Sequence, residues 1–188
     1  MGGKLGKQRS HHRRLTEVFR GKIFTVTRRR FQKGGKVFFI DTIEHSSSSV
    51  VLPMREPRTV LLIRQFRPAI GREIWEVPAG TLEAGESPLQ CARREMEEEA
   101  GYRAGRMRRL AVFYPSPGFC TEKMHLFLAE RLTPLPQRLE PDEQIRVHPV
   151  SVTRALRLLR EGRILDAKTI IALLFLHTAA GTSQLVKR

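Results

Sequence analysis

Residues 80–102 read GTLEAGESPLQCARREMEEEAGY, and their order predicts a loop followed by a helix over residues 87–100. Ser87 is a good N-cap residue, and Pro88 then takes the first helical position, where its missing N–H costs nothing. Gln90 stands three residues after Ser87 and completes a capping box. The segment therefore carries its own signal for where the helix begins.

The end of this helix and its packing side also follow from the sequence. Gly101 is expected just past the last turn, where helices commonly end in a left-handed glycine. Apolar residues recur at helical spacing and predict a narrow stripe facing protein. They are Leu89, Ala92, Met96 and Ala100.

Three glutamates crowd the last turns of the predicted helix. Glu95 lies three and four residues before Glu98 and Glu99, so their Cβ atoms are roughly 5–6 Å apart and their charges repel. The helix dipole also disfavours negative charge at this end. A hard divalent cation would relieve the repulsion, and oxygen ligands suit Mg²⁺. A solvated acidic face paired with Arg93 and Arg94 is the alternative, and the glutamates alone do not decide between the two.

The spacing within the segment is similar to the Nudix box, G-x5-E-x7-R-E-U-x-E-E-x-G-U, where U is a bulky apolar residue. The one departure is Tyr102, which stands where an aliphatic residue is usual. The chain therefore resembles the Nudix hydrolases. The positions in register are Gly80, Glu86, Arg94, Glu95, Met96, Glu98, Glu99 and Gly101.

The resemblance implies an α/β (α+β) fold, namely a Nudix-type α/β/α sandwich with a mixed sheet. It also implies one to three Mg²⁺ or Mn²⁺ ions, which would neutralise a diphosphate and activate a water. The expected metal ligands are Glu95, Glu98, Glu99 and the carbonyl of Ala79.

Two further residues of the box have an expected role. Glu86 and Arg94 are expected to form an ion pair that orients the loop and the helix. Glu86, Arg94 and Glu98 are the residues of the box that we expect to take part in catalysis.

Three segments outside the box resemble the ADP-ribose pyrophosphatase branch: residues 60–69, 73–80 and 114–129. They predict Mg²⁺-dependent hydrolysis of ADP-ribose or a related nucleoside diphosphate sugar, with AMP and ribose 5-phosphate as products from ADP-ribose. Enzymes that act on GDP-mannose resemble the same pattern, so the base and the sugar stay open.

Four residues outside the box are candidates for substrate binding. Pro117, followed by Gly118, falls where this branch places a proline after the box, although Ser-Pro-Gly is also an ordinary turn. Arg67 could clamp the diphosphate, because a guanidinium matches phosphate oxygens, or could be an exposed residue at a strand end. Glu122 could position substrate or support the metal.

The same branch takes its catalytic carboxylate from a loop after the sheet. Here that loop precedes a strand expected over residues 145–150, and it contains Glu140, Asp142 and Glu143. We expect Glu143 to be the general base and place Glu140 second. A solvated acidic loop is the alternative for each of them.

The chain is expected to hold three parts. Residues 1–15 form a basic arm, residues 16–55 a small N-terminal β-lobe, and residues 56–188 the hydrolase domain. The resemblance implies that the lobe helps to form a homodimer. The lobe contains a hairpin of strands 22–30 and 36–44 about Gly34 and Gly35. Further strands are expected over 50–54, 59–66, 74–77, 107–114, 123–131 and 145–150, and helices over 152–160 and 168–178.

Composition limits the partners and the compartment. The net charge of +15 favours polyanions as binding partners, so an RNA-acting Nudix hydrolase is one alternative. A non-catalytic binding module with the same fold is another. Nucleic acid is not favoured, because no RNA-binding module or interleaved aromatics are visible. The arm could be a solubilising tail, a nucleic-acid arm or a transit peptide. Two cysteines without a secretory signal, and an apolar run at 170–176 too short for a bilayer, predict a cytoplasmic protein that does not enter a membrane.

Overall fold

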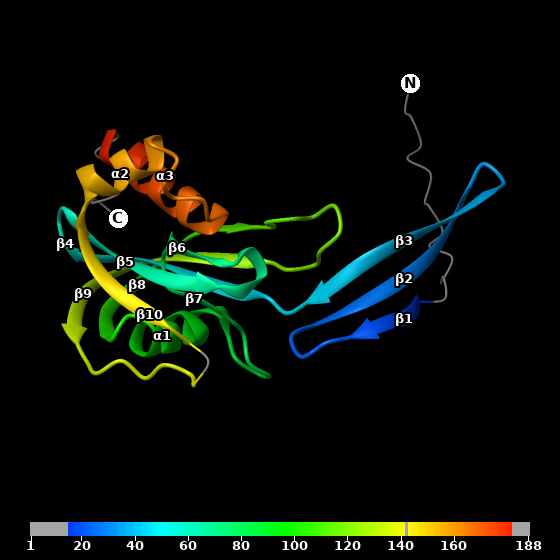
Figure 1. Cartoon of the computed structure of the whole chain (residues 1–188), viewed down its shortest axis with the longest axis horizontal. Helices are drawn as coiled ribbons and strands as arrows, with labels where there is room; N and C mark the ends of the chain where they lie inside the picture. Colours follow the sequence, from blue (N-terminus) through cyan, green and yellow to red (C-terminus); the bar gives the residue numbers. More distant parts are fainter. Residues whose placement is uncertain (1–14, 142, 182–188) are drawn as a thin grey trace, which may run out of the picture. The chain divides into compact units, whose positions relative to one another are not determined.

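The computed structural model describes residues 15–141 and 143–181. The expected basic arm therefore lies outside the described residues except for Leu15, and so does the loop candidate Asp142. The chain divides into two compact units. Residues 15–45 and Ser116–Thr121 belong to the first unit, and the rest of the described chain belongs to the second (Figure 1).

The first unit is an antiparallel sheet in the order β1-β2-β3. The strands are β1 (Leu15–Arg20), β2 (Phe24–Lys33) and β3 (Lys36–His45). Gly34 and Gly35 have φ angles of 56° and 75°, which a two-residue hairpin turn requires at both positions, so the predicted hairpin is confirmed. β1 falls in a region for which no strand was predicted. The segment Ser116–Thr121 adds to this unit, because the amide of Ile43 donates to the carbonyl of Phe119 at 2.7 Å.

The second unit is a mixed seven-stranded sheet with three α-helices. Its strand order is β10-β5-β4-β9-β8, with β6 beside β5 and β7 beside β4. β4 and β9 run parallel, and the other pairs are antiparallel. The elements are β4 (Ser48–Glu56), β5 (Thr59–Arg67), a 3-10 turn (Pro68–Ile70), β6 (Arg72–Glu76), β7 (Ala79–Thr81), α1 (Pro88–Glu98), β8 (Tyr102–Phe113), β9 (Met124–Pro134), β10 (Ile145–Ser151), α2 (Val152–Arg160) and α3 (Ala167–Gly181).

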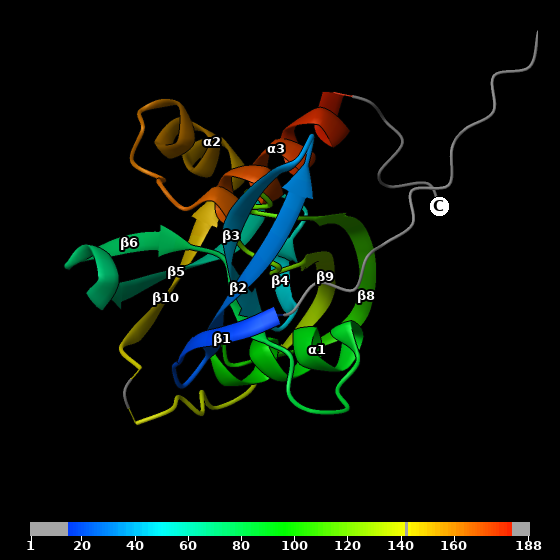
Figure 2. The same cartoon turned by 90° about the vertical axis from the view of Figure 1, so that its right-hand side faces the viewer.

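Helices cover both faces of this sheet. Successive strand residues point to opposite faces. Accordingly, Val50 and Leu52 of β4 belong to a core with α2 and α3, whereas Val51 packs with Met96 of α1. Figures 1 and 2 show α2 and α3 on one face and α1 on the other. The predicted α/β/α sandwich with a mixed sheet is confirmed.

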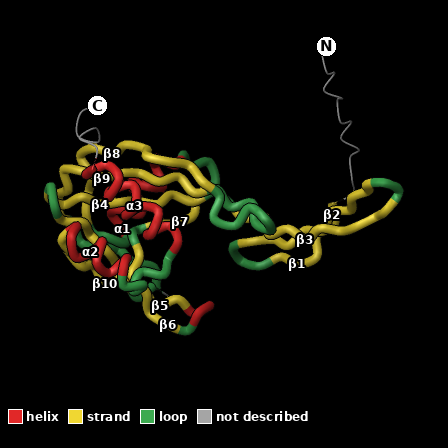
Figure 3. The backbone as a smooth tube through the Cα atoms, turned by 90° about the horizontal axis from the view of Figure 1, so that it is seen from above, coloured by secondary structure: helices red, strands yellow, loops and turns green. Residues whose placement is uncertain are grey.

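The site is positioned by a divergence between β4 and β5. The two strands pair only near their shared turn, at Met54 with Val60 and Glu56 with Thr59. Farther along, β5 pairs with β6 and β4 pairs with β7 (Figure 3). The short connection at residues 77–78 therefore runs from one strand to the other, and α1 packs against both β4 and β7.

Two expectations about side chains and boundaries need correction. Leu89 was expected in the apolar stripe of α1, but it is exposed, and Cys91 lies in the protein interior instead. The strand expected at 107–114 begins five residues earlier, at Tyr102, which packs partly buried beside Met96. In the part of the chain that is described, no helix has the length and apolar character needed to cross a membrane.

Candidate active site

Helix α1 begins as the sequence predicts. The Ser87 hydroxyl accepts the backbone N–H of Gln90, and the Gln90 side chain accepts the backbone N–H of Ser87. Pro88 takes the first helical position. The helix ends at Glu98 with Glu99 as its C-cap, and Gly101 follows with a φ angle of 68°. This frame fixes which side chains of the helix point into the protein.

Glu95 lies pressed against Gly80. Its side chain is buried, and a Cβ built on Gly80 would stand only 1.7 Å from Oε1 and 2.2 Å from Cδ of Glu95. No side chain other than hydrogen fits at residue 80 while Glu95 keeps this position. The glycine that opens the motif therefore makes room for a carboxylate.

Glu99 is more deeply buried, with 3% of the residue exposed. Its Oε2 accepts the backbone N–H of Ala79 at 2.8 Å. Burial and the nearby charge of Glu95 raise the pKa of Glu99 well above its ordinary value, and the Ala79 N–H opposes this only in part. Burial likewise raises the pKa of Glu95 to about 7, although Arg94 lowers it, and Glu98 and Glu143 add repulsion.

Arg94 gathers the acidic groups around it. Its Nε and Nη2 donate to Glu86 at 3.0 and 3.1 Å, which is the ion pair that the resemblance implied. Its Nη1 donates to Glu95 Oε1 at 2.7 Å and to Glu98 Oε2 at 3.2 Å. Its Nη2 also reaches the carbonyl of Thr81 at 3.1 Å. One guanidinium thus joins the loop to the helix and partly neutralises three glutamates.

The loop after β9 is attached to the end of α1. The amides of Leu135 and Arg138 donate to the carbonyls of Gly101 and Glu98 at 2.8 and 3.1 Å. The Gln137 side-chain amide donates to the carbonyl of Glu99 at 2.5 Å. These contacts satisfy carbonyls that a helix end leaves without intrahelical partners.

Farther along, the same loop carries both base candidates. Glu143 is half-buried, and its charge raises the pKa of both Glu95 and Glu99, so its carboxylate lies near theirs. Glu140 is exposed, and its backbone N–H donates to Glu143 Oε2 at 3.0 Å. The structure thus brings Glu143 to the glutamates of α1.

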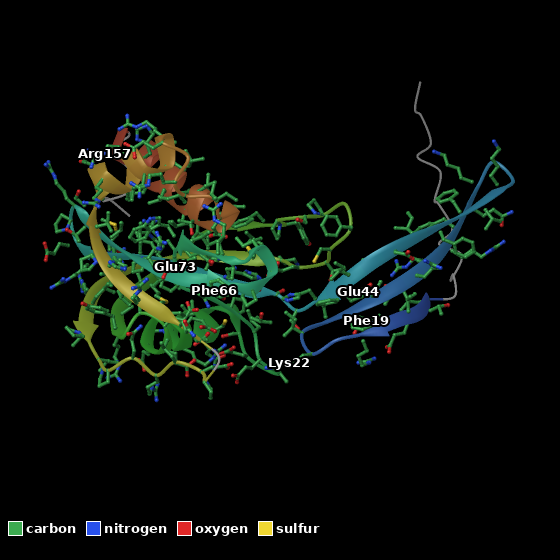
Figure 4. All side chains as sticks on the ribbon, viewed as in Figure 1. Phe19, Lys22, Glu44, Phe66, Glu73 and Arg157 are labelled. Atoms are coloured by element: carbon green, nitrogen blue, oxygen red, sulfur yellow. The ribbon has the colours of Figure 1, made fainter. Side chains whose placement is uncertain are left out.

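Arg67, at the end of β5, is held by a buried carboxylate. Its Nε and Nη2 donate to Oε1 and Oε2 of Glu76 at 2.6 and 2.7 Å. The hydrogen bonds that Arg67 donates to Glu76 and the charge of Glu76 raise the pKa of Arg67. The charge of Glu99 raises it further, so Arg67 lies within electrostatic reach of Glu99. Phe66 and Glu73, labelled in Figure 4, lie opposite each other on β5 and β6, next to this pair.

The remaining substrate candidates lie in different units. Glu122, in the second unit, accepts the Ser48 hydroxyl at 2.5 Å. Pro117 and Gly118 belong to the first unit, on the segment that pairs with β3. Hydrogen bonds join Ala79 to Glu99 and join Arg94 to Glu86, Glu95 and Glu98. Glu143 and Arg67 lie within electrostatic reach of Glu99.

The donor set fits a hard divalent cation. Buried carboxylates with raised pKa values beside one another are stabilised when a cation with oxygen preference lies among them. In the described residues no three His, Cys, Asp or Glu side chains are arranged as a finished metal site. The reason is visible in the contacts, because Arg94 draws the carboxylates of Glu95 and Glu98 toward itself.

Thiol chemistry does not fit the same place. Cys91 is buried beside Gly80, and burial raises the pKa of its thiol to about 11. The thiolate is the nucleophilic form of cysteine. Cys91 is therefore a protonated core residue at neutral pH.

Sequence reasoning missed a polar network on the other side of Arg67. Glu76, Asp166, Lys168 and Thr169 are joined by hydrogen bonds near the start of α3. One signal for it was present, since Glu76 is a carboxylate between Trp75 and Val77 in a short apolar strand, where an unpaired charge is costly.

Several known proteins are similar to this chain. The family model of the NUDIX domain matches residues 44–173. The chain is 36% identical over 164 residues to an ADP-ribose pyrophosphatase of Bacillus subtilis (strain 168), covering 86% of this chain and 89% of the relative. It is 39% identical over 146 residues to a GDP-mannose pyrophosphatase of Citrobacter koseri, covering 72% and 75% of the two chains.

A solved structure shares the fold. The crystal structure of an ADP compounds hydrolase superposes with a TM-score of 0.80 at 19% sequence identity. The match covers 91% of this chain and 94% of that chain. At this identity the likeness speaks for the fold alone.

Proposed function

This chain belongs to the Nudix hydrolase family, and from that premise we propose that it hydrolyses the diphosphate linkage of ADP-ribose with Mg²⁺. The products are then AMP and ribose 5-phosphate. Support comes from the B. subtilis ADP-ribose pyrophosphatase, which is similar to this chain over nearly the whole length of both proteins.

The observation that carries the proposal is the pair of buried carboxylates, Glu95 and Glu99. One is packed against Gly80 and the other against the Ala79 amide. Buried carboxylates that share a site destabilise each other unless they are protonated or a cation lies with them. Such a cost is typical of a functional site rather than of a structural one.

Glu95, Glu98, Glu99 and the Ala79 carbonyl are the groups that would hold the cation. When bound, a divalent cation neutralises diphosphate oxygens and makes a water more acidic. In the structure Arg94 donates hydrogen bonds to Glu95 and Glu98. It also donates to Glu86 and to the Thr81 carbonyl, and these bonds do not involve the expected metal ligands. Arg94 can therefore keep the loop and helix together while Glu95 and Glu98 turn toward a cation.

Glu143 is our choice for the general base. Its carboxylate would take the proton of the attacking water as the water oxygen bonds to phosphorus and the bridging P–O bond breaks. The Glu140 N–H holds Glu143 Oε2, which limits the rotation of that carboxylate. Glu140 itself is the second candidate.

Arg67 would clamp the diphosphate on the other side of Glu99. Its Nε and Nη2 edge is engaged by Glu76, so the remaining N–H groups of its planar fork are those that could reach a phosphate. Pro117, Gly118 and Glu122 stay candidates for contacts with the substrate.

A second candidate substrate is GDP-mannose. Support for this candidate comes from GDP-mannose pyrophosphatases that are 37–39% identical to this chain over 71–72% of its length. The buried carboxylates serve either substrate, because both contain the same diphosphate linkage between nucleoside and sugar.

A hydrolysis screen tests the proposal. Purified full-length protein is incubated with Mg²⁺ and ADP-ribose, GDP-mannose, NADH, a dinucleoside polyphosphate or capped RNA, and products are resolved by ion-exchange chromatography. We expect ADP-ribose to give the highest kcat/KM, with AMP and ribose 5-phosphate in equal amounts. A higher kcat/KM for capped RNA, or no turnover of any compound, would contradict the proposal.

The quaternary state and the compartment are also proposals. We propose a homodimer formed through the first unit, because it exposes apolar side chains such as Phe19 and Phe39 in its sheet and Ile23 in the turn between β1 and β2. A cytoplasmic location remains a prediction from cysteine use and the N-terminal sequence.

A further inference from the structure

Arg67 belongs to a set of four charges joined by hydrogen bonds. Glu76 is 1% exposed and accepts Arg67 on both oxygens and Lys168 on Oε2. Lys168 is itself buried and donates a second bond to Asp166 Oδ1 at 2.9 Å. Two cations and two anions thus balance in the second unit, with Glu76 and Lys168 buried and Arg67 and Asp166 partly exposed.

This set is tied to the backbone that leads into the site. Asp166 Oδ2 accepts the Thr169 N–H at 3.0 Å and its hydroxyl at 2.6 Å, which caps the start of α3. The Thr169 oxygen in turn accepts the buried N–H of Val77 at 2.8 Å. Two residues later along the chain, the Ala79 N–H donates to Glu99. The start of α3 therefore contacts the strand immediately before the metal-holding segment.

From this chain of contacts we infer that Lys168 is a positioning residue for substrate binding, which acts by fixing Glu76 so that Arg67 presents its free N–H groups to the diphosphate. The inference rests on the proposed function, in which Arg67 binds the diphosphate. Lys168 makes its hydrogen bonds to Glu76 and Asp166, so its effect on substrate binding passes through Arg67. Its charge also lowers the pKa of Glu99, and this direct effect persists when Arg67 is replaced.

The physical reason is that Glu76 needs both cations. A buried carboxylate is stable in its ionised form only when its oxygens are well paired. Burial acts to raise the pKa of Glu76, but the bonds and charges of Arg67 and Lys168 outweigh it and hold that pKa below the ordinary value. Without Lys168, Glu76 Oε2 would lose one of its two donors, and Arg67 alone would balance the charges of Glu76, Asp166 and Glu99. The carboxylate of Glu76 could then rotate, and the guanidinium bound to it would no longer be held in one orientation.

The first test is a double-mutant cycle between Lys168 and Arg67. The variants are Lys168→Met, Arg67→Gln and both together, and the readouts are kcat and KM for the substrate that the wild type hydrolyses fastest. We expect Lys168→Met to raise KM about tenfold and to change kcat less than about threefold, the pattern of lost uniform binding. In the Arg67→Gln protein the same change should cost less than about twofold in kcat/KM, because coupled residues are not additive.

Matched variants separate positioning from stability. Lys168→Arg keeps the cation and should restore KM to within about threefold of the wild type. Thr169→Val removes the hydroxyl bonds to Val77 and to Asp166 but keeps Lys168, Glu76 and Arg67 and the bonds among them. It should lower the melting temperature with KM nearly unchanged. Equal effects of Lys168→Met and Thr169→Val on KM, or additive effects in the cycle, would overturn the inference.

A second readout does not depend on turnover. In ¹⁵N-labelled protein the Arg67 Nε–H signal, assigned by its loss in Arg67→Lys, should be narrow in the wild type and Lys168→Arg but broadened or shifted in Lys168→Met. An unchanged signal in Lys168→Met overturns the inference even if no substrate is found, and absence of turnover in the wild type counts against the proposed function alone. Lys168→Gln replaces Lys168→Met if the latter does not fold. If neither variant folds, Lys168 is a determinant of folding, and the inference is likewise overturned.

Discussion

Glu99 is the residue at which folding and function conflict most. It is an almost fully buried carboxylate whose pKa is raised by burial and by Glu95. Glu99→Gln keeps its shape and the bond from the Ala79 N–H but removes the charge. We therefore expect kcat/KM to fall at least about 100-fold, because the loss of a metal ligand costs at least as much as the roughly 10- to 100-fold typical of a residue that only supports a ligand. The melting temperature without metal should stay unchanged or rise, and differential scanning calorimetry checks this.

A neighbouring glutamate provides the control for Glu99. Glu97 lies on the same helix and pairs with Arg103 at 3.0 Å and with Arg138 at 3.7 Å, away from the buried carboxylates. Glu97→Gln should retain kcat/KM within about threefold, because surface ion pairs contribute little. Full activity of Glu99→Gln, or equal losses in the two variants, would contradict the metal assignment.

Gly80 gives a second prediction at the residue scale. Because a Cβ there would overlap the Glu95 carboxylate, Gly80→Ala must move Glu95 or the loop. We expect at least a tenfold loss of kcat/KM and a higher Mg²⁺ concentration for half-maximal activity. Gly105→Ala is the comparison, since its Cβ would meet only Arg131, at 3.1 Å, and should leave the Mg²⁺ dependence as in the wild type. Mg²⁺ titration of initial rates distinguishes the two.

Sequence reasoning found residues that follow local rules and missed those that depend on packing. The capping residues Ser87 and Gln90 act within one turn of chain, so their roles could be predicted. Leu89 was predicted to be buried and is exposed, whereas Cys91 is buried, because the exact rotation of α1 against the sheet decides which side chains point inward. The ion pair of Glu76 with Lys168 joins residues 92 positions apart, which no local pattern reports.

At the scale of elements, the end of α1 and the loop that follows β9 act together. Gln137 bonds the Glu99 carbonyl, and the same loop carries Glu143 toward Glu95 and Glu99. Gln137→Ala leaves a carbonyl at the helix end with one donor fewer, which costs about 1 kcal/mol of the free energy of unfolding. We also expect kcat to fall more than KM changes, because the loop that bears the base becomes less ordered. Urea unfolding and steady-state kinetics measure the two effects.

Arg138 supplies the control for this loop. Its side chain is exposed and reaches Glu97 at 3.7 Å, while its backbone N–H makes the bond to Glu98. Arg138→Ala therefore keeps the backbone attachment and should leave kcat unchanged. A larger fall of kcat in Arg138→Ala than in Gln137→Ala would show that the amide of Gln137 does not order the loop.

Element boundaries show where sequence reasoning reached its limit. Apolar runs such as residues 60–63 predicted β5 well, because a strand buried on both faces is apolar throughout. β7 has only three residues, Ala79–Thr81, and exists because β4 has left β5 and offers a free edge. β8 begins at Tyr102 because it pairs with β9 as far as Pro134. Both follow from pairing rather than from composition.

For the whole molecule, the carboxylates predict how stability depends on pH in the absence of metal. The folded pKa of Glu95 is about 7, above the unfolded value of about 4.3. Its contribution to stability is therefore fully present below the unfolded pKa and is lost as pH rises through the folded pKa. The loss between pH 5.5 and 8 is about 2 kcal/mol, because part of the total is already lost below pH 5.5. Glu76 has a lowered pKa, so its contribution falls only under more acid conditions.

Melting temperatures at pH 5.5 and 8, in EDTA and in Mg²⁺, measure this effect. In EDTA the protein should melt several degrees lower at pH 8, and Mg²⁺ should remove most of the difference, because a ligand that binds the folded state stabilises it. Glu95→Gln lacks the titrating group and should show a smaller pH difference in EDTA. A wild-type melting temperature that rises from pH 5.5 to 8 in EDTA would contradict the assignment.

The first unit raises a separate question of stability. β3 exposes Val37 and Phe39 on one face of the sheet and Phe38 and Ile40 on the other. Apolar side chains exposed together on a small sheet are typical of a surface that contacts another protein. We propose that a second copy of the chain covers it.

The mass in solution tests this dimer. Light scattering after size-exclusion chromatography should give twice the chain mass of 21.6 kDa for the wild type. Phe19 and Phe39 are 54% and 60% exposed, and Phe19 is labelled in Figure 4. The double variant Phe19→Ser with Phe39→Ser should shift the mass toward one chain, because it removes apolar area from the proposed interface. Leu165→Ser removes a side chain of similar exposure, 51%, from the second unit and should leave the dimer intact. If the wild type has the mass of one chain, or if Leu165→Ser dissociates it equally, the first unit is not the interface and its exposed apolar residues need another partner.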